Sequence, residues 1–169
     1  MPPLATRVLS ASQLQTLALH GEERSAEPGE VLFTVGDASY PFIAILEGEV
    51  EILNEAGEHL VTHTDHGFVG EMNLLSGQTV FLTARVAKPT RYIAVERAAL
   101  RDLLFDDSSL SDLLLTAFIE RRENLQRRQG VGIEIVGPPA DSGTRELAAF
   151  ANRQRIPYTV RDPATDEAA

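Results

Sequence analysis

The sequence predicts an α+β protein in three stretches: short strands, then helices, then one strand–helix–strand segment. From about residue 25 to 97, turn signals recur about every 8–12 residues, which is typical of an antiparallel sandwich or barrel. From Ala98 onward the apolar residues follow a helical period. After Gly130 the pattern changes again, so we expect domains at 1–130 and 131–163, with an acidic tail or linker at 164–169.

The first region opens with a short helix at 10–20, which Ser10 or Ser12 can cap and Gly21 ends. Strands separated by turns follow, at 31–35, 42–53, 60–64, 79–86 and 91–95. In the strand 42–53, apolar residues alternate with Glu47, Glu49 and Glu51. A period of two places these carboxylates on the solvent face.

Two helices are predicted next, at 98–105 and at 109–129. The second begins with Ser109-Leu110-Ser111-Asp112, which has the form of a capping box. Spacings of four, three and four along this helix connect the residues of a short coiled-coil-like seam: Leu114, Phe118, Arg121 and Leu125. This seam indicates either packing on the helix's own barrel or a homodimer through the helix 109–129.

The third region predicts a strand at 133–136, a helix at 144–155 and a strand at 158–160. Leu147, Phe150 and Ala151 are expected to face inward from this helix. A strand–helix–strand unit of this size can hardly bury both faces of its sheet alone. We expect it to pack against another structural element or to form the beginning of a larger domain.

Composition excludes several classes of function. The chain has 169 residues and a net charge of -10, which weighs against nucleic acid as a partner despite a cluster of arginines at 121, 122, 127 and 128. The absence of cysteine excludes disulfides and thiolate chemistry. Apolar stretches fall far short of the roughly 20 residues that span a bilayer, and residues 1–4 do not resemble the start of a secretory signal, so none is expected. We therefore expect a cytoplasmic protein without a membrane partner.

The most informative stretch is 68–78, in which Gly70 and Glu71 open a short helical turn between strands. Successive backbone N–H groups at such a turn can bind an anion, and the carboxylate can accept hydrogen bonds from sugar hydroxyls. The motif Gly-Glu-x-x-Leu-Leu at 70–75 resembles the phosphate-binding cassette of the cyclic nucleotide-binding domain family. Pro28-Gly29-Glu30, Gly36-Asp37 and the sequence 46–50 agree with this family pattern.

The resemblance covers about residues 10–128. It implies a double-stranded β-helix, a jelly-roll-like barrel, with flanking helices, a long C-terminal helix and here a short βαβ extension. It also implies a ligand site formed by Gly70, Glu71, Met72, Asn73, Val80 and Phe81. The expected ligand is a cyclic nucleotide or another small anion, and no other cofactor is expected in this chain.

This chain departs from the family pattern where the phosphate would be held. Family members that bind cyclic nucleotides end the cassette with an arginine and a small residue, and these positions fall on Val80 and Phe81. The bidentate cation is thereby lost. Arg85 lies five residues along a strand, with the wrong side-chain parity to replace it. The phosphate site is therefore expected to be degenerate, and a purely structural role for Gly70 and Glu71 stays open.

Other site chemistries fit the sequence less well. His59, His63 and His66 lack the His-x-His spacing of a barrel metal site, so surface histidines without a metal are expected. No catalytic triad or Walker-type loop is visible, so no catalytic residue is expected. The residues after Gly130 are too few for a winged helix-turn-helix, which needs about 60–80 residues.

The last segment resembles the first βαβ of a thioredoxin- or glutaredoxin-like fold, with Pro138-Pro139-Ala140-Asp141-Ser142 where Cys-x-x-Cys would stand. The order of the two regions resembles the N-terminal part of bacterial thioredoxin-reductase-like flavoproteins, which implies a fused or associated reductase domain. The sequence predicts a non-catalytic regulatory or sensor module. The alternatives are a closed-pocket dimerisation or assembly scaffold and, less favoured, a truncated transcription regulator.

Overall fold

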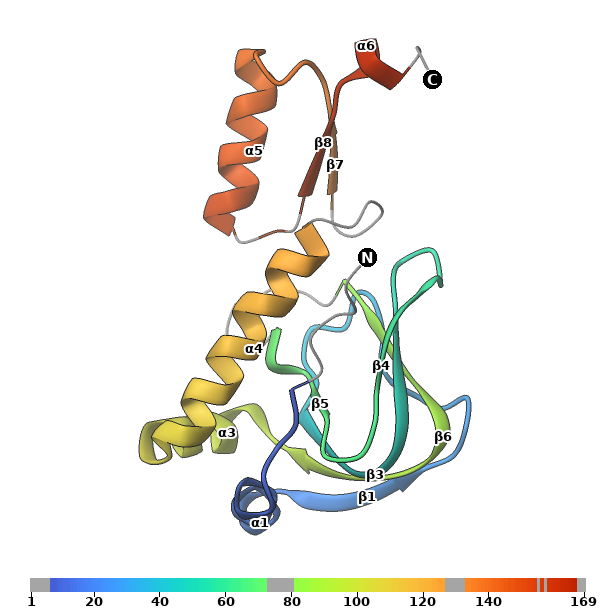
Figure 1. Cartoon of the computed structure of the whole chain (residues 1–169), viewed down its shortest axis with the longest axis vertical. Helices are drawn as coiled ribbons and strands as arrows, with labels where there is room; N and C mark the ends of the chain where they lie inside the picture. The colour runs from blue at the N-terminus through green and yellow to red at the C-terminus, as the bar shows by residue number, and fades with distance from the viewer. Residues whose placement is uncertain (1–6, 73–80, 127–132, 155, 157, 167–169) are drawn as a thin grey trace. The chain divides into compact units, whose positions relative to one another are not determined.

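The computed structural model describes residues 7–72, 81–126, 133–154, 156 and 158–166. It contains two compact units, residues 1–121 and 122–169. The first unit holds an antiparallel sheet that curls into a barrel (Figure 1). The elements from the N-terminus onward are α1 Ala11–His20, β1 Glu22–Ala26, β2 Val31–Phe33, β3 Phe42–Leu53, β4 His59–His63, β5 Phe68–Val69, β6 Thr83–Val95, α3 Arg97–Asp106 and α4 Ser108–Gln126. Helix α4 begins in the first unit, and its residues from Arg122 onward belong to the second.

The long strands β3 and β6 organise the barrel. They pair antiparallel from Phe42↔Val95 to Leu53↔Thr83, and β1, β2, β4 and β5 attach to one or the other. The sequence predicts two strands where β6 is one, because Pro89 and its neighbours resemble a turn. Lys88 and Pro89 are exposed, and register shifts between Glu47 and Val50 of β3 take up the irregularity.

The first unit has two cores on opposite faces of β3. Ile43 and Ile45 point into the barrel, with Val50, Val86 and Tyr92. Phe42 and Ala44 point the other way, into a layer formed with α1, α3 and α4. The first half of β3 is therefore buried on both faces, and the alternation that the sequence predicts for this strand holds only where the helices no longer cover it.

Helix capping follows the sequence at α1 and differs from it at α4. Ser10, one of the two predicted caps, caps α1, and it forms a reciprocal capping box with Gln13. At α4 the capping residue is Asp107, whose Oδ1 accepts a hydrogen bond from the Leu110 N–H at 2.9 Å, and not Ser109. A carboxylate at this end also interacts favourably with the helix dipole.

The second unit has the predicted strand–helix–strand order. Strands β7 Ile133–Val136 and β8 Tyr158–Arg161 pair in parallel, with helix α5 Ser142–Gln154 between them in the chain. The short helix α6 Pro163–Asp166 follows, within the stretch expected to be a tail. Thr144 and Ala151 form the buried side of α5, but Leu147 and Phe150 are exposed, so the expectation that these two face inward is wrong.

Gly48 offers a test of the close pairing between β3 and β6. Its φ is +115°, and a Cβ there would meet Thr90 Oγ1 and lie 2.5 Å from Pro89 O. Gly57 also has a positive φ, +79°, but open space around it. We expect Gly57→Ala to cost about 1–2 kcal/mol of unfolding free energy for backbone strain alone, and Gly48→Ala to cost clearly more. Urea unfolding followed by circular dichroism measures both, and equal losses would contradict the close approach.

Candidate functional site

The start of the predicted cassette lies where the sequence places it, directly after β5. Gly70 has a φ of +103°, and a Cβ there would lie 3.1 Å from Pro41 O, so glycine suits this position in both conformation and space. Glu71 follows and is 1% exposed. Met72 is half-buried, and so is Phe81, which follows the cassette in the sequence. Asn73 and Val80, the other two predicted site residues, lie outside the described residues.

Glu71 is held by an arginine from the long helix α4. Arg121 Nη1 donates to Glu71 Oε1 at 2.7 Å and to the Phe68 carbonyl oxygen at 3.0 Å. The guanidinium carbon lies 4.5 Å from the centre of the Phe68 ring, within the range of a cation–π contact. One side chain of α4 thus contacts the backbone, the ring and the carboxylate of the segment that opens the cassette.

This ion pair is buried, and burial sets its energetics. The side chains of Arg121 and Glu71 are 7% and 1% exposed. Moving two charges out of water costs several kcal/mol per ion, which their attraction offsets only in good geometry. Removing one partner leaves the other charge buried and unpaired. The pair therefore links the position of the cassette to the position of α4.

Other nitrogen atoms of Arg121, and one of His63, are also buried. In the described part of the chain, Arg121 Nε, Arg121 Nη2 and His63 Nδ1 have no hydrogen-bond partner. Burial, and to a smaller extent the positive charge of Arg121, lower the pKa of His63 from 6.5 to about 3. His63 is therefore neutral at physiological pH beside a fixed cation.

The histidines correct one expectation. His59 and His66 are exposed, but His63 is buried at the end of β4, so the expectation of a surface histidine is wrong there. With the period of two in a strand, His63 shares a face with Val61, and it lies opposite buried Val50 of β3, a pairing that the local sequence does not show. Among the described residues, no group of three or more histidines and carboxylates could hold a metal ion.

The predicted seam residues of α4 lie in the core of their own chain. Leu114, Phe118, Arg121 and Leu125 are all buried, and Leu114 belongs to the core that α4 shares with β3. Their helical spacing indicates the face of α4 that packs within the chain. Leu115 and Ile119 are the exposed apolar residues of the helix. Dimerisation through 109–129 stays a prediction, and these two residues are the ones that could carry it.

The pairing of Arg121 with Glu71 was missed from the sequence. The two residues are 50 positions apart, and no local spacing connects them. One signal was present: an arginine on the apolar stripe of a helix that packs on its own chain needs a buried carboxylate partner.

The comparisons with known proteins agree with this geometry. The sequence matches the cyclic nucleotide-binding domain family over residues 23–107, just over half of the chain. The chain therefore belongs to the cyclic nucleotide-binding domain family. A search of curated proteins gave no match. In the described residues, no helix has the length and apolar content needed to cross a bilayer.

Several solved proteins with different described roles share this fold. A protein of a cyclic-GMP-dependent signalling pathway that regulates bacterial phytopathogenesis is 22% identical, with a TM-score of 0.61 over 69% of this chain and 96% of its own. A putative cyclic nucleotide-binding protein from Geobacter metallireducens is 24% identical, with a TM-score of 0.53 over 69% and 86%. The catabolite activator protein of Thermus thermophilus is 21% identical, with a TM-score of 0.57 over 69% and 56%. At these identities the likeness shows the shared fold.

The buried pair predicts a specific pattern of stability losses. We expect Arg121→Met to lower the unfolding free energy by about 3–5 kcal/mol, because Glu71 is left as an unpaired buried charge. Adding Glu71→Gln should recover part of this loss. Urea unfolding of both single variants and the double variant measures the coupling. The matched control is the more exposed pair Arg85–Glu51, where Arg85→Met should cost less than about 1 kcal/mol. Equal losses at Arg121 and Arg85 would contradict the buried pair.

Stability should also depend on pH through His63. The unfolded chain binds a proton on this histidine below its ordinary pKa of 6.5, whereas the folded chain binds it only near pH 3. Protons therefore favour unfolding, and stability present above pH 6.5 is lost as the pH falls, by at most about 1.4 kcal/mol per pH unit. Between pH 7 and 5 the decline should be flatter in His63→Leu and unchanged in the exposed control His59→Gln. Parallel curves for His63→Leu and wild type would refute this.

Proposed function

We propose that this chain is a non-catalytic regulatory module that couples the state of the cassette to helix α4. The observation that supports this most directly is the buried ion pair between Glu71 and Arg121. The carboxylate that could accept a hydrogen bond from a sugar hydroxyl is instead buried and paired with an arginine of α4. Any ligand that takes a hydrogen bond from Arg121 or gives one to Glu71 changes the energy of that contact.

The ligand we propose is a small anion, with a cyclic nucleotide as the family's own candidate. Arg121 Nε and Nη2 are buried donors with no partner in the described part of the chain, and the neutral ring of His63 lies in the field of the same cation. Charged donors in a buried site form strong hydrogen bonds to anionic oxygen. In sequence, however, Val80 and Phe81 stand where arginine and a small residue hold the cyclic phosphate, so we propose a degenerate phosphate site.

This predicts weak binding of the common cyclic nucleotides. By titration calorimetry we expect dissociation constants above about 100 μM for cyclic AMP and cyclic GMP, because the bidentate phosphate contact is lost. Val80→Arg with Phe81→Ala should tighten binding, whereas Val80→Arg alone should not, because the Phe81 ring remains. Low-micromolar binding by the wild-type chain would contradict the degenerate site.

The coupling to α4 needs a separate measurement. Hydrogen exchange of the full chain with millimolar cyclic nucleotide should change together at 68–72 and along α4, and this joint change should be lost in Glu71→Gln. A change at the cassette without one in α4 would contradict the proposed coupling. Absence of any binding would favour the alternative, a closed-pocket scaffold that serves assembly alone.

A more specific proposal concerns the enzyme that this module regulates. We propose that the chain is the regulatory part of a thioredoxin-reductase-like flavoprotein, fused or associated, and the parallel β7–α5–β8 unit is the observation that supports this. The family match ends at residue 107 and does not reach this unit. Titration of the chain into such a reductase, with NADPH oxidation as the readout, tests this: a saturable change of rate supports it, and no change at any ratio opposes it.

A further inference from the structure

The outer face of α5 carries apolar side chains that its own unit does not cover. Leu147 is 55% exposed and Phe150 is 48% exposed, although both are large and apolar. Thr144 and Ala151 form the side of the helix that packs inward; at about 100° per residue, Leu147 borders that side and Phe150 lies about 100° from Ala151. The exposure of Leu147 and Phe150 is therefore a property of the folded unit and not of a frayed end.

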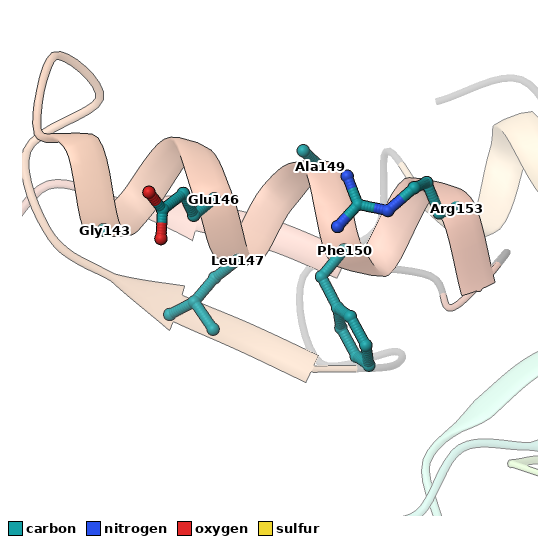
Figure 2. Close-up of a pocket in the computed structure, with 6 residues that line it drawn as sticks. All are labelled: Gly143, Glu146, Leu147, Ala149, Phe150 and Arg153. Atoms are coloured by element: carbon teal, nitrogen blue, oxygen red, sulfur yellow. The ribbon is translucent and has the colours of Figure 1, made fainter.

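These residues belong to a hollow along the helix. It has a volume of about 510 Å³ and is lined by Gly143, Glu146, Leu147, Ala149, Phe150 and Arg153. Figure 2 shows Leu147 and Phe150 pointing to the same side of α5, while Glu146 and Arg153 project from a neighbouring side, Glu146 nearer the start of the helix and Arg153 nearer its end. Every lining residue comes from α5, so the hollow is one face of one helix.

The charges on this face are opposite and unused. Within the described part of the chain, the side chains of Glu146 and Arg153 form no hydrogen bond or ion pair. They stand seven residues apart, which is two helical turns or about 10.5 Å. That spacing is too long for a pair within the helix, since helical ion pairs form at three or four residues.

We propose that this face of α5 binds the same face of a second copy of the chain, with the two helices antiparallel. With the two-fold axis between Ala149 and Phe150, Glu146 of each copy lies opposite Arg153 of the other. Phe150 of each copy then lies over the small Ala149 of its mate. A two-fold contact must be self-complementary, and this row of residues satisfies that requirement in charge and in size.

Electrostatics favour a second copy over an arbitrary partner. The chain carries a net charge of -10, so most of its surface repels another copy. The row on α5 is neutral, with one acidic and one basic side chain placed symmetrically about its centre. The helix is about 20 Å long, so the contact is short and its affinity modest. This inference concerns assembly and is independent of the ligand at the cassette.

The test uses sedimentation of the full chain at about 100 μM, where wild type should be dimeric. Glu146→Arg and Arg153→Glu each place like charges opposite one another at both ends, and each should weaken the dimer at least about tenfold. Mixing the two variants creates opposite pairs at both ends, so a heterodimer should form. The double variant Glu146→Arg/Arg153→Glu should dimerise again. The control Arg145→Glu changes an exposed charge elsewhere on α5 and should leave the dimer intact.

A monomeric wild type at this concentration overturns the proposal. Single charge reversals that leave the dimer intact also overturn it, because the contact must then lie elsewhere. Leu115 and Ile119 of α4 would then be the next residues to substitute. Failure of the mixed variants to form a heterodimer overturns the proposed contact, because pairing residue 146 with residue 153 places opposite charges at both ends of the mixed dimer. A parallel contact would already place like charges opposite one another in the wild type, so single reversals would not weaken it. Circular dichroism of each variant confirms that the exposed substitutions leave the fold unchanged.

Discussion

The pairing of Arg121 with Glu71 is the interaction on which the arrangement of the first unit depends. Both charges are buried, and each is tolerable only because the other is 2.7 Å away. Glu71 is positioned by the turn at Gly70, and Arg121 by the packing of Leu114 and its neighbours on the outer face of β3. Neither the cassette nor the helix can shift alone without separating two desolvated charges. This gives a small module a stiff connection between a binding loop and its C-terminal helix.

Strand β3 also connects the cassette with α4. Its residues 42–45 are buried on both faces, one in the barrel and one against the helices. Position 42 therefore belongs to the layer that α4 packs on, while position 43 pairs with Val69 just before the cassette. A displacement of α4 reaches the cassette by two routes, through Arg121 directly and through the shared strand. Packed cores transmit such strain because they have little free volume.

Local patterns in the sequence predict much of this fold, and contacts between distant segments account for the rest. The Gly-Glu motif, the capped helix at Ser10 and the period of two in the second half of β3 are local, and the structure confirms them. Strand β1 was missed because its residues 22–25 are polar and exposed, and its pairing with β6 is its main support. The roles of Arg121 and His63 depend on segments far apart in the chain. A period along one helix shows which face is apolar, but not which surface covers it.

The second unit also has apolar surface whose covering partner the sequence does not identify, and this affects its stability. A parallel pair of strands with one helix buries few large side chains, here chiefly Ile135 and Ala151, and parallel sheets are normally covered on both faces. One face of its sheet carries the ion pair between Glu134 and Arg161, at 3.0 Å, beside exposed Val136. Apolar surface is left exposed on the strands, at Ile133, Val136 and Val160, and on α5, at Leu147 and Phe150. A unit this small gains stability from any contact that covers those two side chains, at about 25 cal/mol per Å² of apolar surface. Association through α5 would therefore stabilise the unit as well as join two chains, so its folding and its assembly should be coupled.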